Sequence, residues 1–89
     1  MPDLMVPDVC EQALDHLIDS GGSDLTPCVH AFTGLLLALA LRSGMSDPEE
    51  AAYHALVAVR THAGAWRSTG LPARVWVLGL ALQCYRQRP

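Results

Sequence analysis

Apolar residues recur at helical spacing in four segments of the chain, and prolines and glycines separate these segments. In the first segment, residues 7–19, apolar side chains fall on one side of a helix and charged ones on the other, which is typical of an amphipathic surface helix. The apolar side consists of Val6, Cys10, Ala13, Leu14, Leu17 and Ile18. Gly21 and Gly22 follow, and they predict the end of this helix because glycine readily takes the left-handed conformation.

The second helix is predicted over residues 27–43, with Thr26 as its N-cap and Pro27 in its first turn. Its body is apolar on every side. A helix without a polar face either lies at the centre of a bundle or is covered by another subunit. Gly34 and Ala38 are four residues apart, so they predict a strip of small residues at which a neighbouring helix approaches closely.

The third helix, predicted over residues 48–67, has the clearest start in the chain. Ser46 with Glu49, or Asp47 with Glu50, can form a capping box, and either pair satisfies the first free N–H groups of the helix. The acidic residues also complement the positive end of the helix dipole. The predicted buried stripe consists of Ala52, Leu56, Val59, Ala63 and Trp66.

The fourth helix is predicted over residues 72–86, beginning at Pro72. Its predicted buried stripe is Val75, Leu78, Leu82 and Tyr85. Further apolar residues lie outside that stripe, so this helix is also more apolar than one buried face requires. The four segments together predict a single all-α domain, residues 1–89, in which three to four short helices form a compact bundle.

The chain carries more apolar residues than a lone bundle of its size should hide. Of its 89 residues, 51% are hydrophobic and only 17% are charged. A small protein has the largest surface for its volume, so it should need the most polar residues. We therefore expect part of the apolar surface to be exposed for a protein partner, or for a second copy that packs through the second or fourth helix.

Charge is divided along the chain, although the net charge is only −3. Residues 1–41 contain acids and no arginine, whereas residues 51–89 contain arginines and no acid. The alternative to a functional division is a solvated surface with chance asymmetry. If the division is functional, complementary charge would orient a partner. The candidate acidic face is Asp8, Glu11, Asp15 and Asp19, and the candidate arginine and aromatic face is Arg60, Arg67, Arg74, Trp76 and Arg86.

Neither a metal nor another cofactor is predicted. The candidate ligands are Cys10, His16, Cys28, His30, His54, His62 and Cys84. Zinc sites usually take two ligands from one turn, and only Cys28 and His30 are closely spaced. An odd number of cysteines without a CxxC pair does not predict a disulfide framework, so we interpret the cysteines as small buried hydrophobic residues.

The sequence predicts no enzyme. It contains no nucleophile elbow and no glycine-rich oxyanion loop. Asp47, Glu49 and Glu50 are the closest group of carboxylates, and helix capping already accounts for them. A phosphate-binding P-loop requires a lysine, and the chain has none.

The second and third predicted helices resemble a helix-turn-helix in outline. However, Glu50 falls where the second helix of that motif turns an apolar residue inward. Asp47 and Glu49 would also present negative charge to the phosphates, which argues against direct nucleic-acid binding through this helix. Contact through the C-terminal arginines stays open as an alternative.

No targeting or membrane segment is predicted. Asp3 and Asp8 stand where a signal peptide would carry positive charge, and no long apolar run follows them. The most apolar stretch, residues 29–41, is shorter than the about 20 residues that span a bilayer. We therefore expect a soluble cytoplasmic protein.

These observations favour a non-enzymatic protein-interaction module, a small regulator or inhibitor that occupies a surface of a larger protein assembly. One alternative is an inhibitor from a phage or mobile element that presents the acidic face of its first helix to the basic channel of a nucleic-acid-processing defence complex. This alternative rests on analogy. Another is a nucleic-acid-associated regulator that uses the C-terminal arginines.

Overall fold

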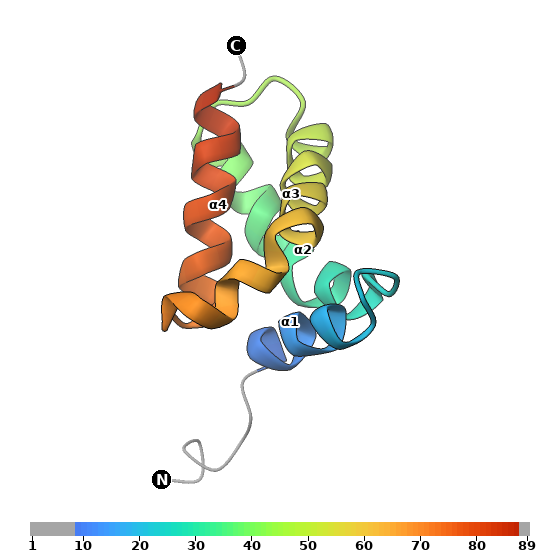
Figure 1. The fold of residues 1–89 in the computed structure, drawn as a ribbon. Coiled ribbons are helices and arrows are strands. Elements are labelled where there is room, and N and C mark those ends of the chain that lie inside the picture. Colours follow the sequence, from blue (N-terminus) through green and yellow to red (C-terminus); the bar gives the residue numbers. More distant parts are fainter. Residues whose placement is uncertain (1–8, 88–89) are drawn as a thin grey trace, which may run out of the picture.

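The computed structural model describes residues 9–87, and in that range the chain forms four α-helices and no strand. The helices are α1 (Val9–Asp19), α2 (Thr26–Arg42), α3 (Pro48–Thr69) and α4 (Ala73–Gln87). Helices α2, α3 and α4 pack against one another, and α1 lies across one end of them, where it contacts all three (Figure 1). The predicted all-α bundle is confirmed, with helix bounds close to the predicted ranges. The predicted start of the first helix lies outside the described residues.

The start of α3 uses one of the two predicted capping pairs. Asp47 is the N-cap, and its Oδ1 accepts a hydrogen bond of 3.1 Å from the backbone N–H of Glu50. The helix ends at Gly70, whose φ of 70° lies in the left-handed region that favours glycine. Trp66 is buried beside this end, and its indole Nε1 donates to the carbonyl of Leu71 at 2.9 Å, which holds the connection to α4 in place.

The prediction of Thr26 as the N-cap of α2 was wrong. Leu25 is the N-cap and makes no side-chain capping bond, and Thr26 is already the first helical residue. The N–H of Thr26 instead donates to Oδ1 of Asp24 at 3.2 Å. The carboxylate two residues earlier therefore takes the role that sequence spacing assigned to the threonine hydroxyl.

One hydrophobic core joins all four helices, and the predicted faces of α1 and α3 supply much of it. Every residue of the predicted α3 stripe is buried. On α1 the buried residues are Ala13, Leu14 and Leu17, while Cys10 and Ile18 are partly buried against them. Val6, the remaining member of the predicted face, lies outside the described residues.

The predicted face of α4 was wrong, except for its last member. Val75 is 52% exposed, and Leu78 and Leu82 are only partly buried. The helix instead buries Ala73, Val77, Ala81 and Tyr85. These four residues recur at every fourth position and so form one row along the helix, and α3 is the helix that α4 contacts most. Because α4 is apolar on several sides, its sequence pattern did not single out this face.

Helix α2 is not central, because one of its sides faces outward. It buries Cys28, Phe32, Leu36 and Ala40. Gly34 and Ala38 are both exposed, and nothing lies within 4 Å of the position that a Cβ at Gly34 would take. The predicted close approach of a neighbouring helix at this strip therefore does not occur within residues 9–87.

Candidate interaction surface

An open apolar groove of about 520 Å³ runs between α2 and the N-terminal half of α3. From α2 it is lined by Val29, Thr33, Leu37 and Leu41. From α3 it is lined by Pro48, Glu49, Ala52, Tyr53 and Leu56. The α2 residues are four positions apart, so they form one row along the helix. We call this feature the α2–α3 groove.

Large apolar side chains stand exposed along this groove. Leu41 is 65% exposed and Tyr53 is 62% exposed, and Val29 is also exposed. Val57 follows one turn after Tyr53 on α3 and is exposed as well. Glu49, at one end, is the one acidic residue in the lining. An apolar surface of this kind next to a polar rim is typical of a binding site for another protein.

Thr33 places a polar atom in the wall of this groove. Its Oγ1 is buried and has no hydrogen-bond partner among the described residues. A threonine in a helix usually satisfies its hydroxyl at a backbone carbonyl one turn earlier, as Thr61 does at the carbonyl of Val57. The unpaired hydroxyl destabilises this side of α2.

The side of α2 next to the groove is exposed and formed by small residues and one histidine. We call His30, Gly34 and Ala38 the α2 ridge. On the other side of this ridge lies a smaller hollow of about 250 Å³ between α2 and α4, to which Leu35 and Leu78 contribute. Helix α2 therefore stands between two apolar depressions.

The acidic and arginine-bearing faces predicted from the sequence meet at Arg67. Its Nη2 lies 2.9 Å from Oδ1 of Asp15 and 3.1 Å from Oδ1 of Asp19. The hydrogen bond to Asp15, followed by the one to Asp19, raises the pKa of the Arg67 guanidinium. The two acids of α1 and the arginine of α3 thus form one exposed cluster in which the charges partly neutralise each other.

A third acid of the predicted face also has a contact within the chain. Oε2 of Glu11 accepts a hydrogen bond of 3.4 Å from the backbone N–H of Ala73, the first residue of α4. The carboxylate lies at the positive end of the α4 dipole, where negative charge is favourable. Asp8, the fourth predicted member, lies outside the described residues.

The other members of the predicted arginine and aromatic face are not brought together. Arg60 borders a small hollow between α1 and α3, and Arg74 borders the hollow between α2 and α4. Trp76 is partly buried in a third depression, on the outer side of α4. Arg86 is exposed near the end of α4 and lines none of these three hollows. These side chains are therefore spread over the surface.

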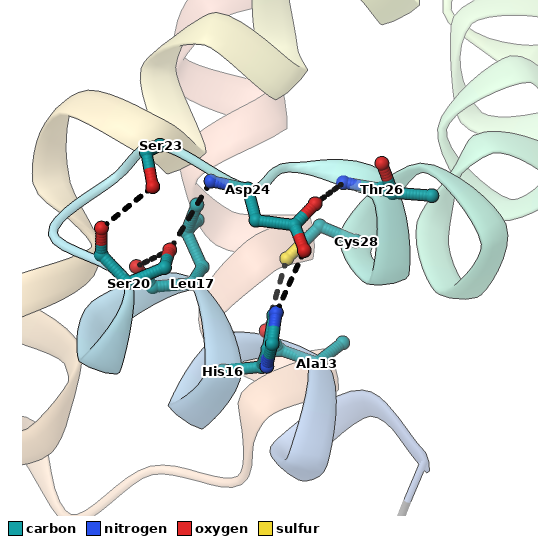
Figure 2. A network of polar contacts seen from close by, with 8 residues as sticks. All are labelled: Ala13, His16, Leu17, Ser20, Ser23, Asp24, Thr26 and Cys28. Atoms are coloured by element: carbon teal, nitrogen blue, oxygen red, sulfur yellow. Dashed lines mark hydrogen bonds and ion pairs between the residues drawn. The ribbon is translucent and has the colours of Figure 1, made fainter.

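The connection between α1 and α2 is held by a network of polar contacts around Asp24 (Figure 2). Its Oδ2 lies 2.8 Å from Nε2 of His16, and its backbone N–H donates to Oγ of Ser20 at 3.2 Å. The contact with His16, followed by those with Thr26, lowers the pKa of the Asp24 carboxyl. These contacts hold the first turn of α2 in place. That turn carries Val29, which lines the α2–α3 groove.

Cys28, which is buried in the core, also links α2 to α1. Its Sγ donates to the carbonyl of Ala13 at 3.4 Å (Figure 2). Burial raises the pKa of the thiol to about 11, and the nearby Cys10 adds to the rise. A thiol with this pKa keeps its proton at neutral pH and is a poor nucleophile.

Metal ligands do not gather in the part of the chain that the structure describes. Two histidines lie next to a carboxylate, His16 beside Asp24 and His54 beside Glu50. No group of three or more histidine, cysteine, aspartate or glutamate side chains that could hold a metal ion is present among residues 9–87. Within the same residues, no helix is both long enough and apolar enough to cross a membrane.

On the α3 side of the groove, the sequence pattern did not single out Tyr53, although Ala52 and Leu56 belong to the predicted stripe. Tyr53 and Val57 are four residues apart and lie outside the predicted buried stripe, so a second apolar row on α3 was the available signal. Comparison of the chain with protein-family models, with curated proteins and with solved structures finds no match.

Proposed function

We propose that the chain is a non-enzymatic protein-interaction module that packs the α2–α3 groove and the α2 ridge against an apolar helical surface of a protein partner. The observation that carries this proposal is the groove of about 520 Å³ with Leu41 and Tyr53 exposed at its edges. Docking of an apolar helix into a hydrophobic groove is a recurrent mode of protein recognition. A module of this size would act as a regulator or inhibitor by covering a surface of its partner.

The dimensions of the groove favour a helix as its occupant. Its α2 wall runs from Val29 to Leu41, which is roughly 18 Å at 1.5 Å per residue and equals about three helical turns. Two helices that pack side by side leave a furrow into which the side chains of a third helix fit. A helix in this position would cover both Leu41 and Tyr53.

The contacts of the charged residues favour this groove, and not the acidic face or the arginine and aromatic face, as the binding surface. Mimicry of nucleic acid by the acidic face would need its carboxylates directed at a basic partner, whereas Asp15 and Asp19 share Arg67. Binding of nucleic acid by arginines would need several of them on one side, and Arg60 and Arg74 border different hollows.

The proposal is tested by placing a photo-cross-linking amino acid at single positions in the source cell. Positions Leu41 and Tyr53 border the groove, and Gln12, exposed on α1, is the control. We expect cross-linked species from the two groove positions and far fewer from the control. Adducts at the groove should also disappear when Leu37→Glu is added, with circular dichroism showing that the variant stays folded.

If the groove positions give no more adducts than Gln12, the proposal is wrong. It is equally wrong if folded Leu37→Glu protein keeps the same adducts, because a charge in the groove wall should repel any apolar occupant.

A further inference from the structure

We propose that the occupant of the α2–α3 groove is a second copy of this chain, which lays its own α2 antiparallel into the groove of the first. This inference rests on the proposed function, and it identifies the protein partner as another copy of the same chain. It is carried by three features of the described residues: a ridge beside a groove, an uncharged centre, and opposite polar groups at the two ends.

The first feature is shape. A twofold interface uses the same surface on both copies, so that surface must carry a projection and a depression side by side. The α2 ridge lies directly beside the α2–α3 groove. If α2 of one copy enters the groove of the other, the twofold axis places α2 of the second copy in the groove of the first.

The second feature is the small size and neutrality of the centre. Gly34 and Ala38 are exposed in the middle of α2, and a Cβ at Gly34 would meet nothing within 4 Å. Small residues at a crossing point let two helix axes approach closely. Between Thr26 and Leu41 the helix carries no aspartate, glutamate, lysine or arginine, so two copies of this face do not repel each other there.

The third feature gives the direction. Glu49 lines the groove at the C-terminal end of α2, where Arg42 is also exposed four positions after Ala38, and His30 is exposed near the N-terminal end. Gly34 and Ala38 lie between these ends. An antiparallel crossing at the two small residues brings each Glu49 carboxylate to the end of the partner's α2 that carries an exposed imidazole. A parallel crossing would instead bring the two carboxylates together.

The test uses analytical ultracentrifugation to measure the mass of the purified full chain over a wide range of concentration. We expect a dimer whose dissociation constant rises about tenfold or more, equivalent to about 1.4 kcal/mol, when Gly34→Gln adds a bulky side chain to the ridge. Gly79→Gln is the matched control. Gly79 is also an exposed glycine inside a helix with nothing within 4 Å, but it lies on the outer side of α4.

Both glutamine variants should fold, because glutamine is a better helix former than glycine and each site has room. Gly34→Gln should therefore give a stable protein whose dimer is weaker, while Gly79→Gln should dimerise as before. For the direction, Glu49→Lys should weaken the dimer, and the further change His30→Glu should restore it in part. Failure of that rescue would contradict the antiparallel arrangement.

A monomer at all concentrations would overturn the second copy as the occupant. If that monomer still gave cross-linked adducts with another protein at Leu41 and Tyr53, the proposed function would stand and only this inference would fall. If it gave none, both would fall. A dimer that responds equally to Gly34→Gln and Gly79→Gln would use another surface and would also overturn the inference.

Discussion

Arg67 of α3 donates to Asp15 of α1 through two nitrogens, with Nε at 3.2 Å and Nη2 at 2.9 Å from the same oxygen. The two residues are 52 positions apart in the sequence. The contact fastens α1 to the C-terminal half of α3. It also joins a member of the acidic segment to a member of the arginine-bearing segment, so the charge division along the chain does not persist as two separate faces in space.

Arg67→Gln should lower the unfolding temperature by at most a few degrees, because the ion pairs are exposed and remain hydrated. The loss should shrink as sodium chloride is added, since salt screens exposed charges. Thermal unfolding at low and high salt measures both effects. Arg74→Gln is the control, because Arg74 has no ion pair among residues 9–87. A large loss independent of salt would instead indicate that the alkyl stem of Arg67 contributes by packing.

Thr33→Val should raise the free energy of unfolding by about 1 kcal/mol, because it replaces an unpaired buried hydroxyl with a methyl group of similar shape. Urea denaturation of both proteins measures the difference. Thr61→Val is the matched control on α3, where the hydroxyl is exposed and bonded to a carbonyl, so this change should not stabilise the protein. Equal effects at the two sites would mean that valine acts in some way other than removing the unpaired hydroxyl.

Phe32→Ala should lower the free energy of unfolding by about 3–5 kcal/mol, because the ring is fully buried and its removal leaves a cavity. Leu41→Ala, on the exposed side of the same helix, should cost less than about 0.5 kcal/mol in the monomer. The comparison requires concentrations at which the protein is monomeric. A large loss at Leu41 under those conditions would contradict the exposure of the groove edge.

Stability should fall in mildly alkaline solution because of Cys28. Its pKa rises from the ordinary value of 9.0 to about 11 in the folded chain, so the folded state holds a proton that the unfolded thiol has already lost. The stabilisation is present below pH 9.0 and is lost as the pH rises towards about 11.

Urea denaturation of the wild type and of Cys28→Ala at a series of pH values measures this effect. The variant should show a smaller decline between pH 9 and 10. Burial also raises the pKa of Tyr85 above its ordinary 10.0, so its contribution to the decline begins only at higher pH. Parallel declines in the two proteins would show that Cys28 does not carry the effect.

Local chemistry explains why the helix bounds could be predicted. Asp47 before Pro48 and Gly70 after α3 act within a few residues of themselves, through capping and through left-handed backbone geometry. The buried faces of α1 and α3 could also be predicted, since each has polar residues on the opposite side. By contrast, Asp24 and not Thr26 accepts from a free N–H at the start of α2, because the path of the loop decides which side chain reaches the helix end.

The amino-acid sequence by itself determined a bundle of three to four helices, most of the helix ends among the described residues and the inward faces of α1 and α3, since these depend on neighbours in the chain. Only the tertiary structure decided that α4 buries Ala73 and Ala81 and leaves Val75 outside, and that Gly34 faces solvent. A helix that is apolar all round has no preferred orientation of its own. Its rotation is set by which side packs most closely against the other helices, and that choice also decided which apolar residues stay exposed.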